Sequence, residues 1–133
     1  MFYFFKKRKV SKRKKLSKKK KEESRTEYLK HKELARAVVT GSLLRCNVNY
    51  NYIYNIVAIR DQKTRWGSCS SKGNLNFNYR LAMLPQHLVD YVVTHELCHL
   101  KEMNHSVNFW DLVALTIPDY ANHRAELKSI KVS

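Results

Sequence analysis

The stretch HELCHLKEMNH, from His95 to His105, constrains the fold more than any other part of the sequence. On a helix, His95 and His99 are four residues apart, so both imidazoles project from one face about one turn apart. Each can then bring a ring nitrogen to about 2.0–2.1 Å from one zinc ion. Glu96 lies about 100° round the helix from His95, where its carboxylate can reach a water molecule without filling a coordination position. The pattern predicts a helix that holds Zn²⁺ beside a general base.

A catalytic zinc site needs a third protein ligand besides the two helical histidines. His105 follows His99 by six residues, and a left-handed turn at Asn104 would bring the chain back to the metal. A glutamate from a later helix is the alternative arrangement, with Glu126 as the candidate. We predict His105, because a ligand that is near in the sequence depends on less of the fold.

The opposing hypothesis is an ordinary helix that carries these letters by chance. Against it, the side of the helix away from the histidines is apolar, which predicts a surface that packs on a core. The residues of that face are Val89, Val93, Leu97 and Leu100. Two buried histidines without a metal would also need other partners to offset their loss of hydration. The combination favours a metal site.

Periodicity predicts an α+β domain over residues 22–133, with a small antiparallel three-stranded sheet packed on helices. β-Branched and aromatic residues in near-alternation predict the strands, and Ser70–Gly73 has the composition of a hairpin turn. The predicted strands are Ile53–Arg60, Thr64–Cys69 and Asn74–Leu81. The predicted helices are residues 22–44, Pro85–Lys101, Ser106–Thr116 and Tyr120–Lys128, with Ser106 as a cap.

The strand NLNFNYRL alternates cleanly, so its apolar residues are expected on one face and its three asparagines on the other. The apolar set is Leu75, Phe77 and Tyr79, and the polar set is Asn74, Asn76 and Asn78. In the preceding strand, Gly67 indicates a bulge or a close approach of another group to the backbone.

The charge of the chain is concentrated at its start. The net charge is +15, but residues 1–21 carry twelve Lys or Arg and no acid, and the remaining 112 residues have a net charge of only +3. Such a block repels itself and buries nothing, so residues 1–21 are expected to form a disordered tail. Residues 6–21 would suit contact with nucleic acid or another polyanion, with a merely solvated tail as the alternative.

The sequence indicates neither a membrane span nor a disulfide framework. The opening MFYFF is only five residues long, against about 20 needed to cross a bilayer. Three cysteines, Cys46, Cys69 and Cys98, are an odd number without a CxxC pair, which fits a reduced, cytoplasmic protein. Nothing in the pattern predicts an oligomeric state.

One long segment resembles a known family. The sequence TRWGSCSSKGNLNFNYRLAMLPQHLVDYVVTHELCHLKEMNHSVNFW is similar to the YgjP-like family of zinc metallopeptidase-like proteins, and the likeness covers about residues 53–120. The resemblance implies a minimal zincin-like fold, related to SprT-like and Wss-like proteases, some of which act on proteins crosslinked to DNA. It implies His95, His99 and His105 as zinc ligands and Glu96 as the catalytic acid/base. Longer members carry a β-rich segment where this chain has its lysine-rich tail.

These features predict a zinc-dependent hydrolase, with cleavage of a peptide or protein as the leading activity. Arg65 is expected to bind an anionic group or to pair with Asp90. Asn76 and Asn78 are candidate substrate-binding residues, since zincins offer a strand near the active-site helix to an extended substrate. Two alternatives remain: a pyrophosphatase that hydrolyses nucleoside triphosphates at the same zinc site, and a nucleic-acid-associated zinc module delivered by the basic tail.

Overall fold

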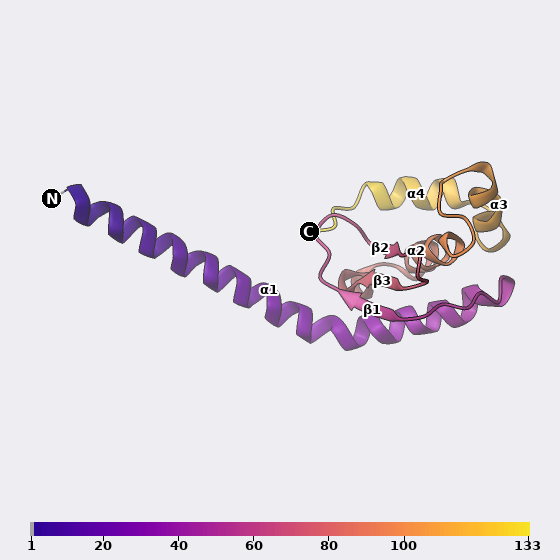
Figure 1. Ribbon diagram of the computed structural model, residues 1–133, viewed down its shortest axis with the longest axis horizontal. Helices are drawn as coiled ribbons and strands as arrows, with labels where there is room; N and C mark the ends of the chain where they lie inside the picture. The colour runs from indigo at the N-terminus through magenta and orange to yellow at the C-terminus, as the bar shows by residue number, and fades with distance from the viewer. Residues whose placement is uncertain (1) are drawn as a thin grey trace. The chain divides into compact units, whose positions relative to one another are not determined.

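The computed structural model describes the backbone of residues 2–133 and the side chains of residues 11–133 (Figure 1). The chain divides into two units between Lys30 and His31. Helix α1, Phe2–Cys46, supplies the described part of the first unit and the beginning of the second. The side chains of the opening MFYFF lie outside the described residues. None of the described helices is both long and apolar enough to cross a bilayer.

Residues 2–21 are helical, which differs from the disorder that their charge predicts. Lysine and arginine have high helix propensity, and no glycine or proline precedes Gly41, so nothing in the local sequence ends the helix. The side chains of residues 11–23 are all exposed, where water and counter-ions screen their repulsion. The boundary of a tail at residue 21, and its contact with nucleic acid or another polyanion, stay predictions.

In the second unit, the end of α1 packs against α2, Gln86–His99. Ser42 Oγ donates a hydrogen bond to Asp90 Oδ1 at 2.6 Å, and Arg45 Nη2 donates to the same oxygen at 3.1 Å. The alternative pairing of Arg65 with Asp90 is therefore wrong, because α1 brings a different arginine to this carboxylate. The buried apolar side chains of this part of α1 include Ala35, Val39 and Leu43, at helical spacing.

The sheet has three short strands, β1 (Val57–Arg60), β2 (Gly67–Cys69) and β3 (Leu75–Asn78), in the order β1-β3-β2. Strand β2 pairs with β3 in antiparallel fashion through the predicted hairpin, in which Gly73 has φ 78°. The expected antiparallel pairing of the first strand is wrong, because β1 is parallel to β3. The sheet is therefore mixed.

Asn78 ties the loop between β1 and β2 to the end of β3. Its side-chain Nδ2 donates to the carbonyl oxygens of Gln62 and Arg65 at 2.7 and 3.0 Å. Its Oδ1 accepts from the backbone N–H of Arg80 at 3.0 Å and caps a short 3₁₀ helix, Tyr79–Met83. The segment between β1 and β2 is thus tied across the end of β3, and β2 lies on the other side of β3 from β1.

Helix α2 is central to the second unit. Strand β2, α3 (Val107–Thr116) and α4 (Tyr120–Lys128) all pack against it (Figure 1). On its core face, Val89, Val93 and Leu97 are fully buried as predicted, whereas Leu100 is only half-buried. The predicted cap of α3 is confirmed, because the Ser106 side chain accepts from the N–H of the third helical residue. The fold is α+β, and α3 packs against the histidine face of α2.

Candidate metal centre

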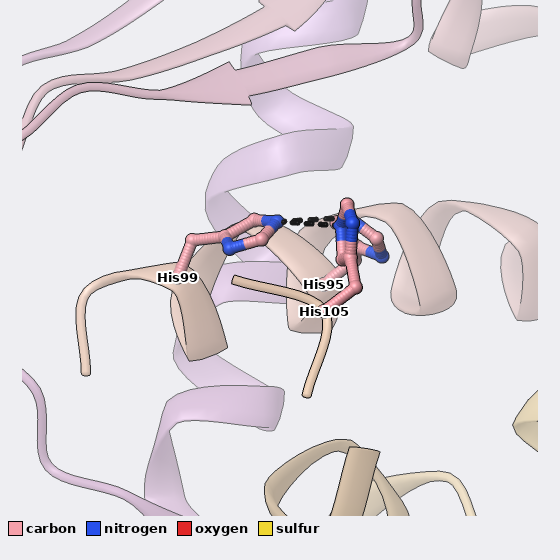
Figure 2. Close-up of side chains that lie close together, drawn as sticks. All are labelled: His95, His99 and His105. Carbon is pink, nitrogen blue, oxygen red and sulfur yellow. Dashed lines mark hydrogen bonds between the residues drawn. The ribbon is translucent and has the colours of Figure 1, made fainter. Parts of the chain in front are cut away.

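Three histidine rings converge at the C-terminal end of α2. Nε2 of His99 lies 3.1 Å from Nε2 of His95 and 3.0 Å from Nε2 of His105, and the third Nε2–Nε2 distance is 3.1 Å. Figure 2 shows the three rings directing these nitrogens toward one common point. The structure therefore brings the three predicted ligands together in a group that could hold a metal ion.

The third histidine arrives by a chain reversal just after the helix. Helix α2 ends at His99, and by His105 the chain has turned back far enough to face it. The predicted left-handed conformation of Asn104 is wrong, because Asn51 is the only non-glycine residue with a positive φ among residues 2–133. The reversal is made with ordinary backbone angles, so the stretch carries no strain that would oppose it.

Hydrogen bonding and burial leave the metal-facing nitrogens ready to act as ligands. The Nδ1–H of His99 donates to the carbonyl oxygen of Glu102 at 2.9 Å. In the neutral ring, Nε2 is therefore unprotonated and its lone pair is free to bind a metal. Burial lowers the pKa of His95 to about 3, with the two neighbouring histidines adding to the effect. Burial also lowers the pKa of His99. Both rings are neutral at neutral pH, the form that binds metal.

The geometry fits zinc. Nitrogen lone pairs at 3.0–3.1 Å repel one another unless a proton or a cation lies between them. The centre of a triangle of this size is about 1.8 Å from each corner, close to the Zn–N distance of about 2.0–2.1 Å, so the three Nε2 atoms would suit a zinc ion as ligands.

Aromatic rings of α3 hold the imidazoles in place. The Phe109 ring stacks on His99 with ring centroids 4.5 Å apart and meets His95 edge-on at 4.9 Å. Trp110 stacks against His105 at 5.9 Å. Since Phe109 is fully buried, these contacts restrict the histidine rotamers before any metal binds.

Glu96 lies in the same cleft as the three histidines. The cleft has a volume of about 250 Å³ and is also lined by β2 and Met103. Only 6% of Glu96 is exposed. Burial raises the pKa of its carboxyl to about 8, and the positive charge of Arg65 opposes that rise. A buried carboxyl beside convergent metal ligands is the environment of a general acid or base.

Gly67 of β2 is the close approach that the sequence predicted. A Cβ at this position would lie 3.1 Å from Glu96 Cγ and 3.1 Å from the carbonyl oxygen of Asn76. The backbone carbonyl is part of the β2–β3 pairing and cannot move aside without disturbing the sheet. Gly67 therefore leaves room for the Glu96 side chain against the strand.

Replacing Gly67 by alanine should displace Glu96 and leave the metal ligands in place. We expect kcat/KM for a cleaved peptide to fall about tenfold or more, since small misplacements of catalytic groups are costly. Overpacking should lower the free energy of unfolding by about 1–3 kcal/mol. Zinc content should stay at the wild-type level, as measured on purified protein by mass spectrometry.

Gly41→Ala is the matched control. Its Cβ would meet only Arg45 Nη1, at 3.3 Å, the end of a flexible side chain. Alanine is also favoured over glycine inside a helix by about 0.5–1 kcal/mol, so activity should be unchanged and stability equal or higher. Equal activity and stability in Gly67→Ala and wild type would show that the close contact with Glu96 has no role.

The structure separates the three predicted substrate-binding residues. Arg65 lines a cavity that also contains Glu96 and His95. Asn76 accepts a weak hydrogen bond from Arg60 Nε at 3.5 Å and lines neither cavity at the site. Asn78 is fully buried, and its side-chain amide is hydrogen-bonded to the loop before β2 and to the 3₁₀ helix. This amide is therefore not available to bind a substrate.

Two further observations concern α4. The alternative ligand Glu126 lies away from the histidine triangle and bonds His87 Nε2 at 2.8 Å. Arg124 and Tyr91, by contrast, line the same cavity as Arg65, although the sequence did not single them out. No local signal distinguishes Arg124 from the chain's other basic residues, because only the packing of α4 on α2 brings it there.

An α+β fold that brings three histidines and a buried glutamate together is the arrangement expected of a minimal zincin-like domain, and comparisons with known proteins agree. The family model described as YgjP-like, metallopeptidase domain, matches residues 4–130, so the chain belongs to the YgjP-like family. The match begins well before residue 53, where the sequence resemblance starts. A search of curated proteins found no match.

Two solved structures have the same fold. The metallopeptidase zymogen abylysin of Pyrococcus abyssi is 25% identical with a TM-score of 0.63, over 68% of this chain and 92% of that one. The metallopeptidase zymogen jannalysin of Methanocaldococcus jannaschii is 24% identical with a TM-score of 0.52, over 71% of this chain and 91% of that one. The second likeness bears on the fold alone.

Proposed function

We propose that the protein is a zinc-dependent metallopeptidase that uses His95, His99 and His105 as metal ligands and Glu96 as its general base. One observation carries the proposal: three imidazole nitrogens converge within 3.1 Å of one another in a cleft that also holds the Glu96 carboxyl. Membership of a metallopeptidase family supports the reaction class.

In this proposal the three histidines bind the metal and Glu96 transfers the proton. The three histidines hold the metal through Nε2, and the Glu102 carbonyl fixes the orientation of His99. A zinc ion there would supply Lewis acidity to the scissile carbonyl and to the attacking water. Glu96 accepts a proton from that water and then donates it to the leaving amine.

Strand β2 is placed to bind the substrate backbone. It is an edge strand in the described sheet and lines the metal cleft. Asn78 and Ser70 donate backbone hydrogen bonds across β2–β3, to Trp66 and Asn74. Because antiparallel pairs alternate, the N–H and C=O groups of Gly67 and Cys69 in between face the free edge. An extended peptide would add there as a further strand, which is how we propose the scissile bond reaches the metal.

Metal removal tests the proposed function. Purified protein incubated with a mixed peptide library should cleave peptides, lose cleavage after chelation, and recover it with one equivalent of zinc. Fragments are identified by mass spectrometry. The alternative function predicts release of phosphate or pyrophosphate from nucleoside triphosphates under the same conditions. Zinc-loaded protein that cleaves no peptide would overturn the peptidase proposal.

We also propose that the protein works in the cytoplasm. Cys46, Cys69 and Cys98 are all free, which suits a reducing compartment.

A further inference from the structure

A second cavity adjoins the metal cleft at Glu96. It has a volume of about 350 Å³ and shares Gly67, His95 and Glu96 with that cleft. This volume is at the lower end of the range for ligand pockets, and it has room for an amino-acid side chain. Glu96 therefore lines both the metal cleft and this adjoining cavity.

The walls of this cavity are apolar and its rim is basic. Trp66, Val92 and Leu127 contribute to the walls. The rim carries Arg65 from the segment before β2, and Arg124 and Lys128 from α4. The basic groups thus come from two elements that are far apart in the sequence and meet only at this cavity.

These cations form no ion pair with an acidic side chain among residues 11–133. Glu96 is the only acidic residue that lines the cavity. Asp61 pairs with Arg80 at 3.0 Å, and Glu126 is hydrogen-bonded to His87 at 2.8 Å; neither acid lines the cavity.

The two guanidinium groups act on the inside of the cavity. Burial raises the pKa of Glu96 and of Tyr91, and the charges of Arg65 and Arg124 partly oppose these two rises. Arg124 is also held by its cation–π contact with Trp110, whose ring centroid is 5.2 Å from the guanidinium carbon. A partly fixed guanidinium loses less freedom when it binds a carboxylate.

We propose that this cavity is a specificity subsite that receives an acidic side chain next to the scissile bond of a peptide. The inference rests on the proposed peptidase function and names its substrate class. With the scissile carbonyl at the metal, the neighbouring side chain enters the cavity that adjoins the cleft at Glu96. Its carboxylate meets Arg65 and Arg124, which bind carboxylates through paired hydrogen bonds, and its methylene groups meet the apolar walls.

Matched peptides test the subsite. For a peptide found in the library experiment, the residue flanking the scissile bond is made Glu or Gln, and kcat/KM is measured for both. We expect the Glu peptide to be preferred about tenfold or more, the range for a charge-assisted hydrogen bond. The double variant Arg65→Gln/Arg124→Gln should lose the preference and keep its zinc. Lys131→Gln, an exposed lysine that does not line the cavity, should retain it.

A binding measurement separates this inference from the proposed function. Fluorescence anisotropy of the labelled Glu and Gln peptides is followed on zinc-loaded Glu96→Gln protein, with and without the two arginine substitutions. If the protein cleaves both peptides equally well, or binds both equally, the subsite proposal is overturned and the peptidase proposal stands. If the protein binds the Glu peptide more tightly but cleaves neither peptide, the peptidase proposal is overturned and the acidic binding site stands. Displacement of the Glu peptide by a nucleoside triphosphate that is then hydrolysed would assign the cavity to phosphate instead.

Discussion

Glu96→Gln should reduce kcat for peptide cleavage by about 10²–10⁴-fold while one equivalent of zinc stays bound, because general acid–base catalysis typically contributes that much. Glutamine has the same shape but cannot accept a proton from water. The residue lies beside the histidine triangle and is not part of it, so the metal should be retained. The measurement pairs kcat on a cleaved peptide with zinc content.

Glu102→Gln is the matched control for this substitution. Glu102 is half-buried in the same stretch of chain, and it contributes its backbone carbonyl to His99, which the substitution preserves. Its variant should retain wild-type kcat and zinc. A Glu96→Gln protein that turns over like wild type would mean that another group takes the proton.

His105→Ala should lose bound zinc, because two helical histidines are too few ligands for a stable catalytic site. The affinity should fall by more than the about 10–100-fold typical of losing only a ligand's hydrogen-bond partner. His105 is exposed and follows the end of α2, so its substitution should leave the fold intact. Zinc affinity is measured by competition with a chromogenic chelator, and folding by circular dichroism.

Glu126→Gln distinguishes the two possible third ligands. Glu126 bonds His87 rather than facing the triangle, so its variant should bind zinc like wild type. Removal of zinc by Glu126→Gln, with retention in His105→Ala, would assign the third ligand to α4 and contradict the three-histidine site. The zinc-dependent rise in Tm provides a second readout, since a ligand that binds only the folded state stabilises it.

Predictions that depend on local spacing agree with the structure. The four-residue separation of His95 and His99 places both rings on one face of α2 wherever that helix lies. Alternation in β3 predicted the burial of Leu75 and Phe77. The predicted helix cap at Ser106 needs only a hydrogen bond to the N–H of Phe109, three residues along the chain. These features need only backbone periodicity and short-range hydrogen bonds, so few residues suffice to determine them.

Predictions that depend on how distant segments meet were less successful. The parallel pairing of β1 with β3 involves the loop that Asn78 ties across the end of β3. The alternation of residues in β3 suggested that the Asn78 side chain was available to a substrate, but it is bonded to this loop.

The sequence by itself determined the helix that carries His95 and His99, the spacing of His105 from it and the strand beside it, because each is a pattern within a short stretch of chain. Only the tertiary structure decided that Gly67 makes room for Glu96, and that Arg65 and Arg124 meet across one cavity. Those positions depend on the packing of β2 and α4 on α2. Such contacts join residues far apart in the sequence, and no periodicity of the chain encodes them.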